Sequence, residues 1–407
     1  MIATSGDISH LVLLTGAVMV LTMLVKGILE RTVFPPLVGF MALGFCLRWF
    51  NDAWPGLTQG GHEVIIFMSQ LGLVTLLFRV GLGSDITTLV KQLKNASLAW
   101  AANIVVAGLA GYATMVMLLG QGVVPGLIVG AAMTATSVGV SVKVWEDQKA
   151  LKTANGALLM DLAELDDVTA VVLMALVFTV VPLIRSGTSG MLLSTLVSTS
   201  LWFALKMILF GALCFVFAVF LERPMTSFLN RIESRPDSTL TIVGIGFVIA
   251  ALAGALGFSL AIGAFFAGLV FSRDPQCLSL DDAFVPIFDF FSPFFFVGIG
   301  YEFQAGVMGP AMGMGLVLAA VAIGAKVLAN GLPLSLVRGM HSGVLIGFSM
   351  VPRAEIALVI MQKGMHLGDW AVDQQLFGAM VVVSAATCLM SPVVVRVLLN
   401  RWPQILD

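Results

Sequence analysis

The sequence predicts an all-α polytopic membrane protein with about 13 transmembrane helices. Hydrophobic residues make up 59% of the 407 residues and charged residues 11%, with a mean hydropathy of +1.03, whereas soluble domains average roughly 45–50% and about 25%. Apolar runs such as GLVLAAVAIGAKVLANGL (residues 315–332) approach the roughly 20 residues that a spanning helix needs. Because backbone polar groups in lipid must pair internally, and the short alternating strands of a barrel are lacking, helices are expected.

Glycine, proline and charged residues divide the first part of the chain into seven predicted spans. The N-terminus lacks the basic start and cleavage site of a signal peptide, so the first span is expected to remain in the mature chain. A polar connection, Glu222–Asp237, follows the seventh span. The seven spans cover residues 10–30, 33–50, 62–83, 96–119, 123–145, 153–184 and 192–221.

Glycine, proline and charged residues divide the chain after this connection into six more predicted spans. They cover residues 238–256, 258–272, 281–303, 308–334, 342–364 and 374–399. Most of the 21 Lys and Arg then lie at the ends that are cytoplasmic if the N-terminus is outside, whereas the outer ends carry only Arg48, Arg185 and Lys363. The positive-inside rule therefore predicts an outer N-terminus and a cytoplasmic C-terminus.

Two of these spans contain an interruption of polar or helix-breaking residues. The fifth contains TATS (Thr134–Ser137) and the twelfth contains MVPRAE (Met350–Glu355). The two spans are seven apart, and an odd offset means that they cross the membrane in opposite directions, as in an inverted repeat. Interrupted helices in corresponding positions are the best sequence indication of a transporter's binding site near the bilayer midplane.

The span after the first interruption contains DLAELDDV (Asp161–Val168), which has four carboxylates. An Asp at the centre of a lone spanning helix costs roughly 2.5–3.5 kcal/mol, so these acids must line a wet cavity or be neutralised. At about 100° per residue, Asp161, Glu164 and Asp167 form one acidic stripe, and Asp166 lies off its edge. The alternatives are a structural ion-pair network for the Asp pair, and hydration of the cytoplasmic mouth by Asp161 and Glu164.

Close carboxylates in a low-dielectric environment hold protons until a cation displaces them, so a cation and protons compete for the same oxygens. A hard alkali ion prefers oxygen ligands. Asp166, Asp167, Thr134, Thr136 and Ser137 supply such oxygens, together with backbone carbonyls freed by the interruption. The pattern predicts exchange of a monovalent cation such as Na⁺ for protons.

Three more charged residues lie within the last spans. Lys326 is in mid-span, too deep to reach the interface by snorkelling, and is expected to pair with a membrane carboxylate. Arg353 and Glu355 flank the second interruption and are expected to pair with charges near it. The four Cys and four His are scattered without ligand spacing, so no metal cluster is expected. A net charge of −2 gives no sign of nucleic-acid binding.

The sequence resembles bacterial sodium/proton antiporters of the monovalent cation:proton antiporter superfamily over nearly all thirteen spans. Each motif is weak alone, but their order and spacing together are specific. The motifs are LGLVTLLFRVGLGSDI (Leu71–Ile86), ATSVGVSVKV (Ala135–Val144), LDDV (Leu165–Val168), FSLAIGAFFAGLVFS (Phe258–Ser272), SPFFFVGIG (Ser292–Gly300), GAKVLANGLP (Gly324–Pro333) and MVPRAEIALV (Met350–Val359).

The resemblance implies residue roles. Asp167 matches the family's ion-binding carboxylate, and Asp166 matches its companion, which forms a salt bridge to the lysine found here at Lys326. An Asp-Asp pair with this lysine is associated with electrogenic exchange of two protons per Na⁺. The transported Na⁺, Li⁺ or K⁺ and H⁺ are the ligands implied, without a cofactor.

The family fold implies a homodimer in a bacterial inner membrane. Core helices at about 96–184 and 308–399 would move, as an elevator, against dimerisation helices at about 10–83 and 192–303. The sequence departs from the family pattern at Asp161 and Glu164, where small or apolar residues are usual. It also departs at Arg79, Gly83 and Ala354.

The main alternative function is a K⁺/H⁺ antiporter or K⁺ efflux protein of the Kef type, although that branch carries Gln-Asp in place of Asp-Asp. A passive cation channel is a remote alternative. So is an intramembrane aspartyl protease, suggested by GLGSD (Gly81–Asp85), but no Tyr precedes an Asp in this chain. The sequence therefore predicts a transporter rather than an enzyme.

Overall fold

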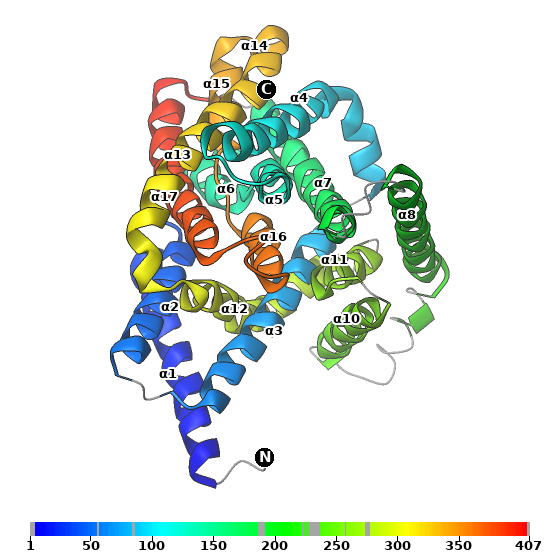
Figure 1. Ribbon diagram of the computed structural model, residues 1–407. Helices are drawn as coiled ribbons and strands as arrows, with labels where there is room; N and C mark the ends of the chain where they lie inside the picture. Colours follow the sequence, from blue (N-terminus) through cyan, green and yellow to red (C-terminus); the bar gives the residue numbers. More distant parts are fainter. Residues whose placement is uncertain are drawn as a thin grey trace. The chain divides into compact units, whose positions relative to one another are not determined.

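The computed structural model describes all residues except 1–4, 55–56, 84–85, 186–191, 222–223, 226, 228–236, 257, 273–276 and 405–407. This described part of the chain is helical and contains no strand (Figure 1). The predicted all-α class is therefore confirmed. Most of the connection Glu222–Asp237, and the last two residues of the GLGSD motif, lie outside the described residues.

Helices occupy all thirteen predicted spans. Short π-helical turns extend three of them, at Thr114–Leu118, Phe217–Leu221 and Val327–Gly331. The helices of the first seven spans are α1 (Ser5–Leu29), α2 (Pro36–Ala53), α3 (Gln59–Gly83), α4 (Ile86–Ala113), α5 (Val123–Thr134), α6 (Val138–Asp147), α7 (Ala154–Arg185) and α8 (Leu192–Val216). Those of the last six are α10 (Asp237–Ala255), α11 (Leu260–Phe271), α12 (Cys277–Glu302), α13 (Met308–Lys326), α14 (Leu332–Arg338), α15 (Met340–Ser349), α16 (Glu355–His366) and α17 (Gln374–Arg401).

Eight helical segments of the described chain are long and apolar enough to cross a membrane. Three shorter apolar helices, at 208–221, 239–255 and 260–271, add to them. Large apolar side chains such as Leu209 and Leu213 of α8 are exposed. Contiguous exposed apolar surface on a helix is typical of contact with lipid.

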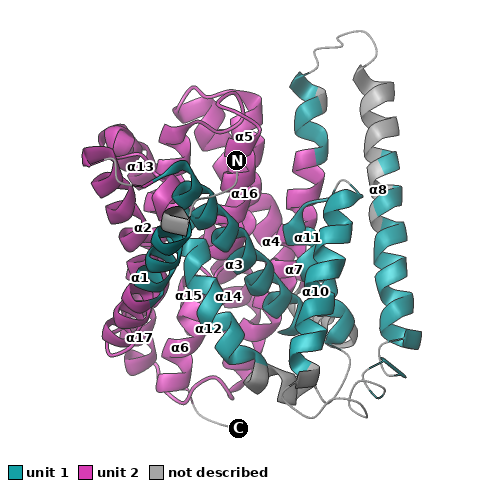
Figure 2. Ribbon diagram, turned by 90° about the horizontal axis from the view of Figure 1, so that it is seen from below, with its two compact units in different colours: residues 1–19, 58–87, 179–298 teal, residues 20–57, 88–178, 299–407 magenta. Residues whose placement is uncertain are grey.

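The chain divides into two compact units, coloured separately in Figure 2. Unit 1 comprises Met1–Met19, Thr58–Thr87 and Thr179–Gly298, and unit 2 comprises Val20–Leu57, Thr88–Phe178 and Ile299–Asp407. Unit 2 contains most of the predicted core helices and also α2, which the sequence assigned to the scaffold. The division into a moving core and a dimerisation scaffold remains a prediction.

Unit 1 is built on close helix packing at glycines. A Cβ on Gly81 of α3 would collide with the carbonyl oxygen of Phe265 in α11, and one on Gly268 of α11 with that of Phe78. In α3, Gly72 likewise lies against the backbone of α12 at Phe291. Small residues let membrane helices approach this closely, and the gain is van der Waals contact.

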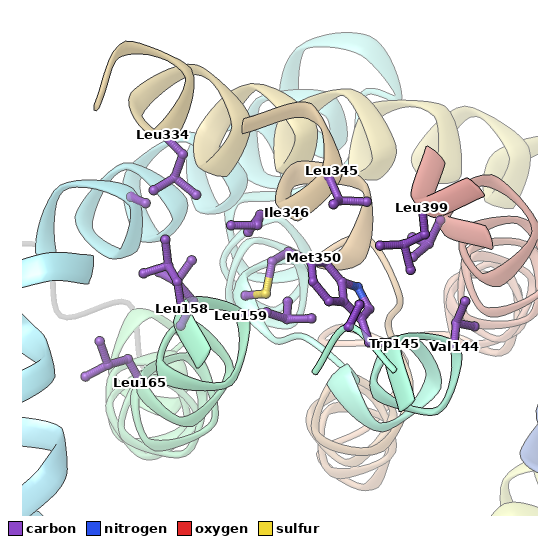
Figure 3. Packing of buried hydrophobic residues seen from close by; sticks show 14 residues of the cluster. Val144, Trp145, Leu158, Leu159, Leu165, Leu334, Leu345, Ile346, Met350 and Leu399 are labelled. Carbon is purple, nitrogen blue, oxygen red and sulfur yellow. The ribbon is translucent and has the colours of Figure 1, made fainter. Parts of the chain in front are cut away.

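Unit 2 has its own apolar core, shown in Figure 3. Trp145 of α6 and Met350, just after α15, are fully buried in it. Leu158 and Leu159 of α7 and Leu345 of α15 complete the centre of the cluster. This core packs α6, α7 and α15 together, and so fixes the position of the acidic segment of α7.

The end of α16 carries a half-exposed titratable pair. Glu302, the last residue of α12, accepts a hydrogen bond from Gln362 (2.9 Å), and its other oxygen lies 3.5 Å from His366 Nε2. His366 lies two residues beyond the predicted twelfth span. The hydrogen bond to Glu302 raises the pKa of His366 above its usual value.

We expect this pair to give a pH-dependent contribution to stability. Because the pKa of His366 is raised on folding, the contribution is fully present below the unfolded-state pKa of about 6.5 and is lost as the pH rises through the folded value. Its size should be under about 1 kcal/mol, since the imidazole is half exposed. Melting temperatures of unaltered protein and His366→Gln, measured across this range, should converge at alkaline pH, and a constant difference would contradict the assignment.

Candidate ion-binding site

Both predicted interruptions are present as extended segments between half-helices. In the fifth span, α5 ends at Thr134 and α6 begins at Val138. In the twelfth, α15 ends at Ser349 and α16 begins at Glu355. Pro352 lies within the second segment, where it lacks an N–H for a helical hydrogen bond and disfavours a helical conformation in the preceding residue.

The two interruptions bind each other. Ser137 N donates to the carbonyl oxygen of Pro352 (2.8 Å), and the Arg353 guanidinium donates to that of Ala135 (2.7 Å). One turn further on, the Ser141 hydroxyl donates to the carbonyl oxygen of Ser349 (2.6 Å). Irregular backbone is tolerated inside a membrane only where its polar groups find partners in the protein. Each interruption supplies these partners to the other.

Asp166 lies beside this crossing and is 2% exposed. Its Oδ1 accepts from Asn103 Nδ2 (2.8 Å), and its Oδ2 accepts from Thr136 Oγ1 (2.7 Å) and from Lys326 Nζ (2.8 Å). The donors come from α4, the first interruption and α13. Three donors, one of them charged, compensate the desolvation of a buried carboxylate.

Lys326 is fully buried and forms the predicted ion pair with Asp166. Its ammonium has three N–H groups, and three acceptors lie within reach: Asp166 Oδ2, Thr136 Oγ1 (2.6 Å) and the carbonyl oxygen of Thr134 (2.9 Å). The π-helical turn Val327–Gly331 follows directly, and such turns occur frequently at functional sites.

Asp167 has different surroundings from its neighbour, as the 100° rotation between them predicts. Its carboxylate is partly exposed, and no hydrogen bond to it is found among the described residues. It lies within electrostatic range of Asp166, Lys326, Glu355 and Glu164. Of the two aspartates, it is therefore the one with oxygen lone pairs available.

The hydroxyl groups of the first interruption make different contacts. The Thr136 hydroxyl binds the Asp166–Lys326 pair, as described above. The Thr134 hydroxyl is turned back to the carbonyl oxygen of Ala131 (2.8 Å), so Thr134 serves the site only through its own carbonyl. The Ser137 hydroxyl is buried beside the Glu355 carboxylate and interacts with it.

Arg353 is fully buried at the crossing. Its Nη1 binds the Ala135 carbonyl rather than a carboxylate, and its Nε and Nη2 have no partner among the described residues. It lies within electrostatic range of Asp166. Arg353 therefore both joins the two interruptions and places positive charge beside the site.

A cavity of about 350 Å³ in unit 2 reaches Glu355, the first residue of α16. Its wall is rich in charged side chains from the ends of neighbouring helices: Glu30, Arg31, Lys143, Asp147 and Arg396. Such a lining is suited to water and ions. The cavity therefore reaches Glu355, which lies within electrostatic range of Asp167.

The other two acids of α7 lie further along the stripe. Glu164 is partly exposed and within electrostatic range of Asp167. Asp161 is also partly exposed, and it lies within electrostatic range of Arg338 at the end of α14. The structure thus brings Glu164, but not Asp161, near the aspartate pair.

Sequence reasoning missed Asn103, which is 1% exposed on α4 and contacts Asp166 directly. The only signal was a single polar residue in an apolar stretch, WAANIVVAG. It also missed Trp145, whose Nε1 donates to Ser349 Oγ (2.9 Å) across the crossing. Both roles depend on contacts between spans that are distant in sequence.

The Trp145→Phe variant should lower the free energy of unfolding by about 1 kcal/mol, because it keeps the buried ring but removes one hydrogen bond between the two interrupted helices. Thermal unfolding of the purified protein would measure this loss. Trp49→Phe, at an exposed position on α2, is the matched control and should leave the melting temperature unchanged. Equal melting temperatures for the two variants would contradict the role of this bond.

The chain is similar to a protein family and to several known proteins over most of its length. The family described as "Sodium/hydrogen exchanger, transmembrane" matches residues 17–401. The high-affinity Na⁺/H⁺ antiporter NhaS3 of Synechocystis sp. is 30% identical over 81% of this chain and 70% of its own. The Na⁺/H⁺-K⁺ antiporter GerN of Bacillus cereus is 29% identical over 81% and 82%.

A solved structure is also similar. The sodium proton antiporter MjNhaP1 from Methanocaldococcus jannaschii superimposes with a TM-score of 0.68, covering 97% of both chains at 16% sequence identity. At this identity the likeness establishes the fold alone. It extends over the whole arrangement of helices described above.

Proposed function

Because the chain belongs to the sodium/hydrogen exchanger family, we propose that it exchanges Na⁺ for H⁺ at the Asp166–Asp167 site. Family membership makes it a multi-pass membrane antiporter of a monovalent cation and protons, and not an enzyme. The identity of the cation, the residues that bind it and the mechanism are the substance of the proposal.

The observation that carries the proposal is the unequal environment of the two aspartates. Asp166 is saturated by three donors, whereas Asp167 is partly exposed and accepts no hydrogen bond from the described residues. Asp167 is therefore the carboxylate that a cation or a proton occupies in turn. A cation bound to Asp167 needs further oxygen ligands. Among the described residues no group of three His, Cys, Asp or Glu could hold a metal ion, so neutral oxygens must supply the other ligands. The Ser137 hydroxyl, which lies beside Glu355, and carbonyls of the interruptions meet this need.

The charges of the site favour the uptake of cations. Asp166, Asp167, Glu355 and Glu164 are four carboxylates, Lys326 lies within electrostatic range of Asp167, and Arg353 lies within range of Asp166. Two formal negative charges are left over. A cation or protons taken up at Asp167 therefore reduce an excess of negative charge in a low-dielectric site.

The proposed cycle begins at the charged cavity beside Glu355. Its lining residues lie at the ends that the positive-inside rule places in the cytoplasm, so the arrangement corresponds to an inward-facing state. A cation reaches Asp167 from this side and releases a proton. Asp166 then loosens its hold on Lys326, whose ammonium gives up a second proton. This accounts for two protons per Na⁺ and for electrogenic exchange.

Alternating access follows if the loaded core turns the site to the other side of the membrane. In this proposal the core helices at about 96–184 and 308–399 move against scaffold helices at about 10–83 and 192–303. The scaffold forms a homodimer in the bacterial inner membrane, with the N-terminus outside and the C-terminus in the cytoplasm. The dipoles of the half-helices that face the crossing stabilise both the cation-loaded and the protonated state.

The second candidate function is K⁺/H⁺ exchange. It is favoured by the similarity to GerN, a Na⁺/H⁺-K⁺ antiporter. The Asp-Asp pair and its lysine argue for Na⁺, since the Kef branch carries Gln-Asp. The site geometry is compatible with either ion, because hydroxyl, carbonyl and carboxylate oxygens bind both.

The experiment is proton flux in sealed proteoliposomes at controlled membrane potential. Addition of Na⁺ should release protons from unaltered protein faster than addition of K⁺, and the rate should depend on potential. Asp167→Asn is the inactive reference. The proposal fails if unaltered protein and Asp167→Asn give the same null response to Na⁺, Li⁺ and K⁺, and a K⁺ response exceeding that to Na⁺ would establish the second candidate.

A further inference from the structure

Asn103 of α4 is buried beside Asp166 in a defined orientation. Its Nδ2 donates to Asp166 Oδ1 (2.8 Å) and also lies 3.3 Å from the carbonyl oxygen of Thr134. Both of these partners are acceptors without a hydrogen. The amide nitrogen, rather than the amide oxygen, must therefore face them, and this settles the orientation of the side chain.

The remaining oxygen of Asn103 has no hydrogen-bond partner within the described chain, and the residue is 1% exposed. A buried carbonyl without a partner is unfavourable. Leucine has nearly the same shape and would fill the position without this cost. A purely structural explanation therefore accounts poorly for an asparagine here, and its bond to Asp166 is the feature that a leucine could not supply.

The three donors to Asp166 differ in what they can do during exchange. Lys326 carries a titratable charge, and in the proposed cycle its hold on Asp166 loosens. Thr136 is both a donor to Asp166 and an acceptor from Lys326, so its hydroxyl can turn when the lysine moves. The amide of Asn103 does not titrate, and its nitrogen can only donate. Of the three donors to Asp166, Asn103 is therefore the one whose hydrogen bond need not change during the cycle.

We propose that Asn103 is a positioning residue that holds the Asp166 carboxylate in one orientation while Lys326 separates from it. This inference rests on the proposed exchange function. Without Asn103, the donor to Asp166 Oδ1 is lost, so the carboxylate can turn with the departing lysine. The neighbouring cation site at Asp167 is then less well ordered, and the cation binds more weakly.

The test is the Na⁺ concentration dependence of proton flux for Asn103→Leu in sealed proteoliposomes at fixed pH. Loss of a hydrogen bond to a charged group should raise the KM for Na⁺ about tenfold. The maximal rate should change little. A merely structural role would lower the maximal rate without changing the KM.

Trp100→Phe is the matched control. Trp100 lies one turn before Asn103 on α4, and its Nε1 donates to Thr169 Oγ1 (2.8 Å) on α7. This variant removes another hydrogen bond between the same two helices without touching Asp166. It should leave the KM for Na⁺ unchanged, so an equal increase in both variants would overturn the inference.

Asn103→Ala guards against a folding failure of the leucine variant and should give the same increase in KM. An unchanged KM in either reconstituted variant would overturn the positioning role, as would failure of both to fold, because Asn103 would then serve stability alone. Exchange by the unaltered protein separates the two proposals. If that exchange is absent, the proposed function fails, whereas an unchanged KM in an active variant rejects only the role of Asn103.

Discussion

Replacement of Lys326 by alanine is expected to lower the free energy of unfolding by about 3–5 kcal/mol, the typical cost of removing one partner of a buried ion pair. Asp166 would remain buried with two neutral donors in place of a counter-charge. The carbonyl oxygen of Thr134 would also lose its ammonium donor. Thermal unfolding of purified protein would measure the loss as a lower melting temperature, and flux in proteoliposomes should lose its dependence on membrane potential.

The double variant Lys326→Ala/Asp166→Asn is the informative companion. Removing both charges avoids an uncompensated buried carboxylate, so part of the lost stability should return. Lys206→Ala, at an exposed position of α8, is the control for loss of a lysine and should change stability little. A melting temperature of Lys326→Ala equal to that of the unaltered protein would contradict the account of this pair.

Asp167→Asn is expected to abolish exchange while leaving the fold intact. Losing one unit charge at about 4 Å from a bound cation, at an effective dielectric of about 20, forfeits about 4 kcal/mol of attraction, which is more than 100-fold in affinity. The stability change should stay under about 1 kcal/mol, because the carboxylate is partly exposed and accepts no hydrogen bond among the described residues.

The same substitution at the neighbouring aspartate should behave in the opposite way with respect to stability. Asp166→Asn would leave Lys326 buried without its counter-charge and should lower the melting temperature markedly. Flux and thermal unfolding, measured on both variants, test this division of labour. Exchange by Asp167→Asn at the unaltered rate, or a larger loss of stability there than in Asp166→Asn, would refute it.

Much of the architecture could be predicted because it depends on local composition. The apolar runs, and the glycine, proline and charged residues that separate them, predicted helices in all thirteen spans. Helices are present in each of these spans. The two interruptions were predicted within Thr134–Ser137 and Met350–Glu355, since polar residues and Pro352 disfavour a continuous helix locally. The structure has them at residues 135–137 and 350–354. Helix geometry further predicted that Asp166 and Asp167 would face different surroundings, because a rotation of 100° per residue needs no tertiary information.

Tertiary structure alone decided which polar groups meet. The direction of the Thr134 hydroxyl, which turns back into α5, could not be read from TATS, because a threonine can equally bond its own helix. The contact of Arg353 with a carbonyl rather than a carboxylate depends on where α5 ends relative to the second interruption.

The sequence by itself determined that the protein lies in a membrane, where its helices and their interruptions are, and where the acidic segment is. Each of these follows from residues within about 20 positions of one another. The partners of those acids were decided only when the helices packed. Asn103 and Asp166 are 63 residues apart, and Asp166 and Lys326 are 160 apart. Hydrogen bonds are short and directional, so contacts over such separations depend on how whole helices pack, which no local pattern encodes.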